Sequence, residues 1–487
     1  RARRSTRPAT PGKRMTDVAV AATPPPDQPP QAPPPSAATT PNPLLNGPIL
    51  PTLLRLAWPN VIALTAGTCV VIAETAYIGR LGTEALAAMA LVFPFVILTM
   101  TMSGGAMGGG AAAAIARALG ADDTERAAAL VAHALLIGIG FGLLFTALML
   151  LFGRPLLQLL GGRGEVLRQA LDYVAVFFGG GVVPWLMNTL SAVLRGTGNM
   201  KLPSFMVLTA AVLQIVLGGI LGLGLGPVPQ FGMKGVAAGT LIAFSSAAAV
   251  MAWYIASGCA RVTLRIAGLR LQRQMLVDIL KVGAVSCFSP LQSVLTIVIF
   301  THMLAAFGDA VLAGYGIGAR LEFMLTSLAF AVGVASVPMV GMAIGAGRVQ
   351  RARRIAWTAG AVSFTVVGLF GVAIAVFPDL WVDLFTDDPR VTTAAHHYLR
   401  AAAPMYAFIG LALSLYFSSQ GAAKVLGPVL AQTARLLFVA LGGAWLIAAG
   451  AGAQAFFLLA AASMAVLGVL AALSVALSRW GARMQPV

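Results

Sequence analysis

A single carboxylate, Glu74, lies deep inside the first long apolar run, WPNVIALTAGTCVVIAETAYIGRLG, which begins at Trp58. The chain has 16 acidic residues, and only Glu74 and Glu322 lie well inside apolar segments. An ionisable group at membrane depth is costly and usually marks a functional site. Because removal from water favours the neutral carboxyl, we predict that Glu74 accepts a proton or another cation.

The rest of the chain is a membrane scaffold. Hydrophobic residues make up 59% and charged residues 10% of the sequence, whereas soluble domains are about 25% charged. Apolar segments of about 20 residues are long enough to span a bilayer as helices. We therefore predict an all-α polytopic membrane protein with twelve transmembrane helices. The predicted spans are 52–79, 86–117, 127–152, 167–194, 203–225, 233–257, 277–306, 311–345, 355–378, 393–420, 427–450 and 454–478.

The net charge of +16 is explained by basic residues in the loops between the apolar runs. Arg and Lys cluster at the ends of the apolar runs, and this pattern sets membrane orientation. We therefore predict no nucleic-acid partner, and we expect both termini on the cytoplasmic side of the inner (plasma) membrane. Cys69, Cys259 and Cys287 show no CxxC or His spacing, so we expect neither disulfides nor a metal site among them.

An internal repeat divides the chain. Tyr173 and Gly196 recur as Tyr398 and Gly421, at an offset of 225. Six helices per repeat make the two halves parallel repeats about an axis along the membrane normal. Within one or two residues, the same offset relates Gly82 to Gly308 and Gly120 to Gly347.

We predict two pseudo-symmetric six-helix lobes joined by a linker. Few apolar residues and many prolines near the N-terminus favour disorder there. The predicted parts are a basic, Pro-rich tail (1–50), a first lobe (51–258), a cytoplasmic basic linker (259–275), a second lobe (276–479) and a C-terminal tail (480–487).

Six short motifs follow one another on this layout: AETAYIGRLGTEALAA, ALGADD, LRGTGNMKLP, GPVPQFGMKGVAAGT, GYGIGARLEFM and GMAIGAG. With them, the chain resembles the multidrug and toxic compound extrusion (MATE) family over residues 50–480. The resemblance implies a central cleft between two lobes and alternating access. It implies an antiporter in the lipid bilayer that exports small organic cations or toxic metabolites in exchange for H⁺ or Na⁺. We separately predict a monomer.

The resemblance also assigns the first-lobe residues. Glu74 falls where the family has an aspartate late in helix 1, and Pro59 matches a helix-1 proline expected to bend that helix. Some members carry an acid on helix 5, four residues after an Asn, where this chain has Gly218 after Gln214. Thr240 matches a helix-6 threonine. Hard cations favour oxygen-rich sites, so this thin ligand set favours H⁺ at Glu74, with Na⁺ there as the alternative.

The second lobe departs from the NorM-like branch, which places acids on helices 7 and 10. The two segments contain no carboxylate inside the membrane, and the chain therefore looks closer to the DinF-like branch. In their place these helices offer Ser289, Gln292, Ser293, Tyr406, Tyr416, Ser418 and Gln420.

Five residues are candidates for a substrate cleft: Glu322, Gln292, Trp185, Tyr406 and Tyr416. Aromatic faces attract flat organic cations. Glu322 either attracts cations in the cleft or pairs with an arginine of a neighbouring helix. Arg320, two residues away, points to a different side of a helix and should not pair with it.

The sequence also bears on two other classes of function. A lipid or polysaccharide-precursor flippase of the same superfamily shares the lobes but often uses basic cavities, whereas the interior charges here are mainly acidic. The sequence has no Ser/His/Asp set, no HExxH motif and no paired carboxylates on one helix face. We therefore predict that the protein is not an enzyme and that it uses no cofactor beyond the coupling ion.

Overall fold

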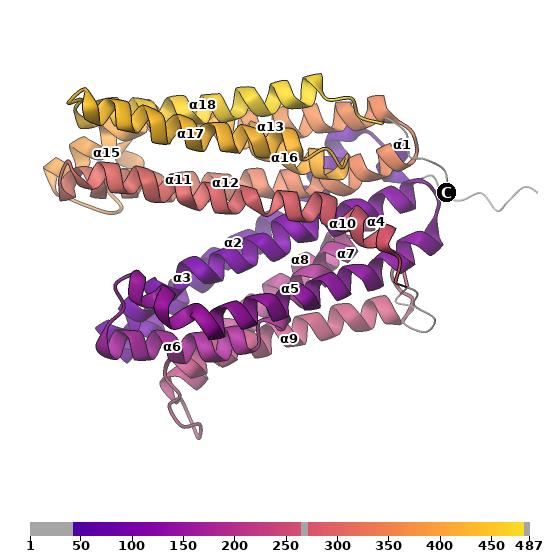
Figure 1. The fold of residues 1–487 in the computed structure, drawn as a ribbon, viewed down its shortest axis with the longest axis horizontal. Coiled ribbons are helices and arrows are strands. Elements are labelled where there is room, and N and C mark those ends of the chain that lie inside the picture. The colour runs from indigo at the N-terminus through magenta and orange to yellow at the C-terminus, as the bar shows by residue number, and fades with distance from the viewer. Residues whose placement is uncertain (1–41, 264–270, 482–487) are drawn as a thin grey trace, which may run out of the picture. The chain divides into compact units, whose positions relative to one another are not determined.

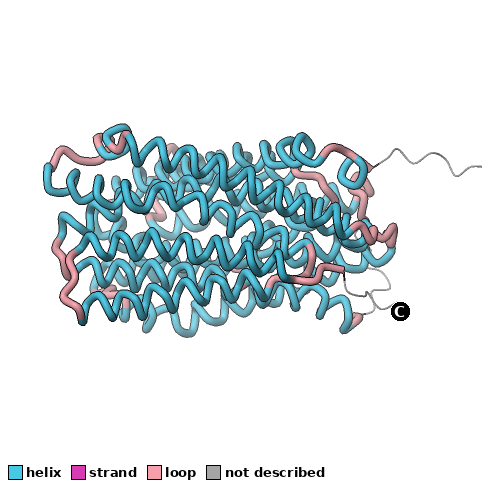
Figure 2. The backbone as a smooth tube through the Cα atoms, turned by 90° about the horizontal axis from the view of Figure 1, so that it is seen from above, coloured by secondary structure: helices cyan, strands magenta, loops and turns pink. Residues whose placement is uncertain are grey.

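The computed structural model describes residues 42–263 and 271–481, which form helices joined by turns and loops, without a strand. Figure 2 shows the helices side by side, with the loops gathered at the two ends of the bundle. The predicted tail lies outside the described residues as far as residue 41, and so do 264–270 of the predicted linker. The first helix among the described residues is the short α1 (Pro43–Asn46), which lies inside the predicted tail.

The helices of the first half carry the indigo to magenta colours of Figure 1. They are α2 (Ile49–Leu81), α3 (Thr83–Thr101), the π-helix η1 (Met102–Met107), α4 (Gly108–Gly120), α5 (Thr124–Leu159), α6 (Gly164–Gly179), α7 (Val182–Gly196), α8 (Lys201–Leu223) and α9 (Met233–Ala256). The chain bends by 48° between α6 and α7, where Gly179, Gly180 and Gly181 offer little resistance to a break.

The second half follows the same order. It contains α10 (Arg273–Ser286), α11 (Phe288–Ala305), α12 (Asp309–Gly345), α13 (Val349–Val376), α14 (Asp379–Val382), α15 (Pro389–Ala402), the 3₁₀ turn η2 (Ala403–Met405), α16 (Tyr406–Gly421), α17 (Leu426–Ala448) and α18 (Ala453–Leu477). The described residues supply eleven helical spans long and apolar enough to cross a membrane, or twelve when the bent pair α6–α7 counts as one. The predicted all-α membrane fold is confirmed.

The turns preserve the repeat in their backbone conformation. Positive φ angles recur at offsets of 225 or 226, and an L-residue such as Ala423 adopts them at a cost. The matched positions are Gly82 and Gly308, Asp122 and Gly347, Gly198 and Ala423, and Gly224 and Gly450. In this register Gly347 corresponds to Asp122, so the predicted partner of Gly120 shifts from Gly347 to Gly345.

Each half has its own hydrophobic core, but the first helix after the linker joins the core of the first half. Met275 and Ile279 of α10 belong to the cluster built on Leu130 and Trp185. The second half is centred on Tyr398 and Phe456. The chain breaks between α10 and α11 at Cys287, so the packing boundary falls within the seventh span.

The two halves meet closely at one end of the bundle, where α9 ends and α10 begins, here called the linker end. Small residues permit this approach. A Cβ placed on Gly341 of α12 would lie 2.7 Å from Cβ of Ala116 in α4, and one on Gly110 would lie 2.8 Å from the backbone nitrogen of Gly283. Arg117 of α4 donates to the carbonyl oxygen of Gly421 at 3.2 Å.

Candidate functional site

Glu74 occupies a buried polar site between α2 and α8. Its side chain lies seven residues before the end of α2, towards the end of the bundle opposite the linker end, and is 7% exposed. Nε2 of Gln214 donates to Oε1 of Glu74 at 2.7 Å. The structure therefore brings together two of the three residues predicted to couple a cation.

Thr240 of α9 completes the predicted set, because it lies beside the Glu74 carboxyl group. Its hydroxyl donates to the backbone oxygen of Val236 at 3.2 Å, which leaves the oxygen free to accept. At 2% exposure Thr240 is screened from lipid and water. Gln214 faces the carboxylate through an N–H group, so in this arrangement the amide acts as a donor.

Tyr77 belongs to the site and was not predicted. It follows Glu74 by three residues and shares its side of α2, and its buried hydroxyl lies beside the Glu74 carboxyl group without forming a hydrogen bond of normal geometry. A Cβ on Gly218 would lie 2.6 Å from this hydroxyl. Tyr77 thus fills the space beside the position where some family members carry the second acid.

Tyr173 was identified only as a marker of the repeat, but it lies near Glu74 and Thr240 as well. It is 1% exposed on α6 and stacks on Phe177 with ring centroids 5.6 Å apart. The site therefore combines one carboxyl group, one amide and three hydroxyl groups from four helices. The spacing of Tyr77 on α2 could have revealed its role, whereas that of Tyr173 required the fold.

The charge of Glu74 has no basic partner in this site. Among the described residues, every salt bridge involves other carboxylates. No group of three or more His, Cys, Asp or Glu side chains within 42–263 and 271–481 is arranged to hold a metal ion. Uncharged donors alone compensate an ionised Glu74, so the carboxyl group can change its protonation state without breaking an ion pair.

Pro59 lies inside α2, fifteen residues before Glu74, and the helix continues through it. A proline there removes one helical hydrogen bond. The neighbouring Asn60 connects α2 to α8, because its Oδ1 accepts from the hydroxyl of Ser204 at 2.9 Å. Bending at Pro59 as a step of transport remains a prediction.

Glu322 of the second half is paired with an arginine of a neighbouring helix. Its Oε1 lies 3.8 Å from Nη2 of Arg435 on α17, and both side chains are largely buried. Arg320 instead places its guanidinium 5.2 Å from the ring centroid of Phe385, which confirms that it does not pair with Glu322. Of the two alternatives for Glu322, the structure favours the interhelical pair.

The other four cleft candidates occupy separate places. Trp185 is fully buried in the first core and stacks on Phe141, with ring centroids 5.3 Å apart. Tyr406 is buried in the second core and donates to the carbonyl oxygen of Gly318 at 3.1 Å. The described structure therefore does not gather these two aromatic residues into one pocket.

Gln292 and Tyr416 make polar contacts with neighbouring helices. Nε2 of Gln292 donates to Thr433 at 2.6 Å, across α11 and α17. The hydroxyl of Tyr416 donates to the carbonyl oxygen of Ser286 at 3.2 Å, at the break between α10 and α11. Their role in binding substrate remains a prediction.

The repeated helical halves, with an isolated carboxyl group inside one of them, define a polytopic membrane transporter. The family model MatE matches residues 59–220 and 286–446. The match covers more than half of the chain, so the protein belongs to the MATE family, whose members are transporters and not enzymes.

Curated relatives match most of the chain. The FAD transporter of Shewanella oneidensis is 26% identical over 374 residues, which cover 76% of this chain and 82% of the relative. The probable multidrug resistance protein NorM of Thermotoga maritima is 24% identical over 383 residues, covering 78% and 81%. Multidrug export protein MepA of Staphylococcus aureus is 26% identical over 361 residues, covering 72% and 77%.

Solved structures share the fold. An outward-facing multidrug resistance MATE family transporter of the MOP superfamily aligns with a TM-score of 0.81 and 23% identity, over 89% of this chain and 96% of that chain. The bent form of the Vibrio cholerae MATE transporter VcmN aligns with a TM-score of 0.80 and 24% identity, over 88% and 96%. At these identities the likeness establishes two six-helix lobes and leaves the site chemistry to the residues of this chain.

Proposed function

We propose that the protein is an antiporter that exports organic cations, and that protons bound and released at Glu74 drive the export. The observation that carries this proposal is the buried Glu74 carboxyl group, which has neutral hydrogen-bonding neighbours and no basic partner. A group of this kind can alternate between charged and neutral forms as access changes. The multidrug relatives support organic substrates.

H⁺ is proposed rather than Na⁺ because the site offers few oxygen ligands. A hard cation takes several oxygens, and Gln214 directs an N–H group at the carboxylate. The flippase alternative is not favoured, because the curated relatives include multidrug resistance and multidrug export proteins.

We further propose that the linker end faces the cytoplasm. The predicted loops on that side hold more Lys and Arg than those opposite, and such a bias marks the cytoplasmic side. Cys259 is exposed near the linker. In a variant lacking the other two cysteines, a membrane-impermeant maleimide should label Cys259 in inside-out vesicles and spare it in right-side-out vesicles. The reverse pattern would contradict this orientation.

The function is tested by reconstituting the full chain into proteoliposomes. Efflux of a fluorescent organic cation is measured under an imposed pH gradient and, separately, an imposed Na⁺ gradient. Wild type and Glu84→Gln, which removes an exposed carboxylate at the start of α3, should export under the pH gradient. Glu74→Gln should not, and Glu74→Asp should retain part of the activity.

Three results would contradict the proposal. Efflux by Glu74→Gln equal to that of wild type would remove Glu74 from the mechanism. Efflux under the Na⁺ gradient alone would replace H⁺ with Na⁺. Transport of FAD, the cargo named for the Shewanella relative, without transport of the cation would replace the substrate class.

A further inference from the structure

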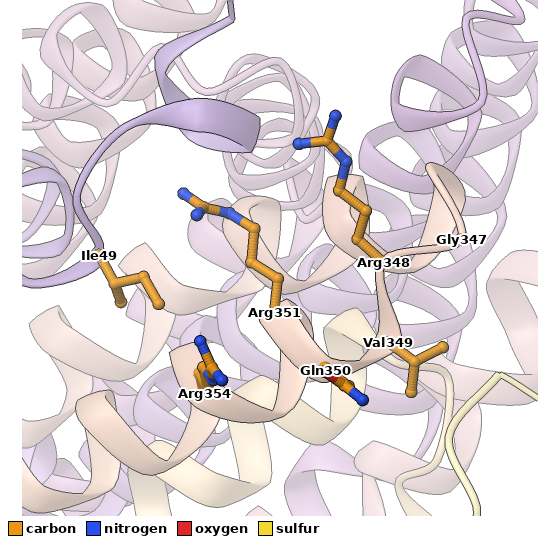
Figure 3. Close-up of a pocket in the computed structure, with 7 residues that line it drawn as sticks. All are labelled: Ile49, Gly347, Arg348, Val349, Gln350, Arg351 and Arg354. Carbon is orange, nitrogen blue, oxygen red and sulfur yellow. The ribbon is translucent and has the colours of Figure 1, made fainter.

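A basic pocket of about 530 Å³ opens at the linker end, beside the start of α2. Figure 3 shows its lining and the three arginine side chains that dominate it. The lining residues are Ile49, Gly347, Arg348, Val349, Gln350, Arg351 and Arg354. The pocket lies outside the Glu74 site, and the proposed transport mechanism does not use it.

The arginines recur every three residues at the start of α13, so Arg348, Arg351 and Arg354 line one side of it. Two of them hold α1 and the residue that follows it. Nη1 of Arg348 donates to the carbonyl oxygen of Leu45 at 2.9 Å and to Oδ1 of Asn46 at 2.8 Å. Nη2 of Arg351 donates to the carbonyl oxygen of Gly47 at 2.5 Å.

Strong donors remain unused in this pocket. The buried Nε of Arg351 has no hydrogen-bond partner among the described residues, and an unpaired buried donor is costly. Arg354 is exposed and makes no side-chain hydrogen bond to the described part of the chain. Within 42–263 and 271–481, no carboxylate forms a salt bridge with any of the three arginines.

We propose that this pocket binds a phosphate oxyanion, supplied by the headgroup of an anionic phospholipid in the adjacent leaflet. Guanidinium groups bind phosphate through charge-assisted hydrogen bonds, and the N-terminus of the 28-residue helix α13 adds positive potential. Ile49 and Val349 supply apolar edges for a lipid. The placing of this pocket at the cytoplasmic leaflet rests on the proposed function, whereas the geometry of the three arginines and their unused donors does not.

A bound phosphate would also act on the contact between the lobes. Residue Leu44 of α1 packs in one cluster with Met342 of α12. A Cβ on Gly198, which follows α7, would lie 2.5 Å from Cδ1 of Leu44. The segment held by Arg348 and Arg351 therefore touches both halves of the chain.

Native mass spectrometry of the full-length protein gives the first test. The protein is equilibrated in micelles containing equal amounts of phosphatidylglycerol and phosphatidylcholine, and the retained lipids are counted. Phosphatidylglycerol should be retained preferentially, and Arg354→Gln should weaken its binding about fivefold, because it removes one of the three guanidinium groups that line the pocket. Arg354 is the residue to change because it does not hold α1.

The matched control is Arg479→Gln, which removes the same charge near the opposite side of α13. Arg353 donates to the carbonyl oxygen of Ser478, next to Arg479, and Arg479 does not line the pocket. This variant should retain phosphatidylglycerol as wild type does. The proposal would be overturned if Arg354→Gln and Arg479→Gln lost phosphatidylglycerol equally. It would also be overturned if wild type showed no preference for the anionic lipid.

Thermal unfolding with inorganic phosphate separates the two sources of the oxyanion. Phosphatidylglycerol should raise the midpoint of wild type more than that of Arg354→Gln, whereas millimolar inorganic phosphate should leave both unchanged. An Arg354-dependent rise with inorganic phosphate alone would replace the lipid with a soluble anion. Lipid retention is measured without transport, so loss of cation efflux elsewhere does not affect this test.

Discussion

Placing a methyl group at Gly218 should push Tyr77 out of the Glu74 site. In Gly218→Ala, the new Cβ would lie 2.6 Å from the Tyr77 hydroxyl oxygen, too close for any relaxed contact. Both residues are confined, because Tyr77 is 8% exposed and α8 packs tightly on α9. Overpacking of this kind typically costs about 1–3 kcal/mol in the free energy of unfolding. We expect a lower unfolding midpoint and slower proton-driven efflux.

The variant Tyr77→Phe should remove most of this cost. Without the hydroxyl, the nearest atom to the new Cβ is the ring carbon Cζ of residue 77 at 3.3 Å, which a displacement of a few tenths of an ångström relieves. Thermal unfolding of wild type, the two single variants and the double variant forms a double-mutant cycle, with an expected coupling of about 1–2 kcal/mol. Equal destabilisation by Gly218→Ala in the Tyr and Phe backgrounds would refute the proposed contact.

Three further predictions concern packing and charge. Nη2 of Arg126 lies 2.5 Å from Oδ2 of Asp278, and reversing either charge alone should lower the free energy of unfolding by about 0.3–1 kcal/mol. Exchanging the two residues should restore it, and failure to do so argues against a direct pair. Arg435→Leu should destabilise by about 3–5 kcal/mol and less in a Glu322→Gln background; equal effects would contradict the ion pair. Trp185→Ala should cost about 3–5 kcal/mol in thermal unfolding, and a cost under about 1 kcal/mol would contradict its burial.

The helices were predictable because apolar length and turn residues act locally. The predicted span 311–345 corresponds to α12, Asp309–Gly345, which begins after the positive-φ residue Gly308. Bends depend on packing across the bundle. The apolar pattern therefore did not reveal the break between α6 and α7 or the attachment of α10 to the first core.

Within the site, the apolar context of Glu74 indicated the acid and the family resemblance indicated its amide, but neither indicated their surroundings. Gln214 reaches Glu74 as the family motif suggested. The absence of an acid at Gly218 indicated a simpler site, but not that Tyr77 would fill the space beside it. Arg435 was not singled out because an arginine in an apolar span is explained only by its partner, and Glu322 is 113 residues away in the chain.

Each half buries one carboxyl group, but the two lie at unrelated positions of the repeat and have different partners. Gln214 of α8 faces Glu74 with an uncharged amide, whereas Arg435 of α17, the corresponding helix of the second half, faces Glu322 with a permanent positive charge. Protonating Glu322 would leave a buried guanidinium without its counterion, which is costly; protonating Glu74 leaves no unpaired charge. We therefore expect proton exchange in the first half and a fixed ion pair in the second, so that Glu322→Gln/Arg435→Leu should retain proton-driven efflux. Loss of coupling in this folded double variant would refute this assignment.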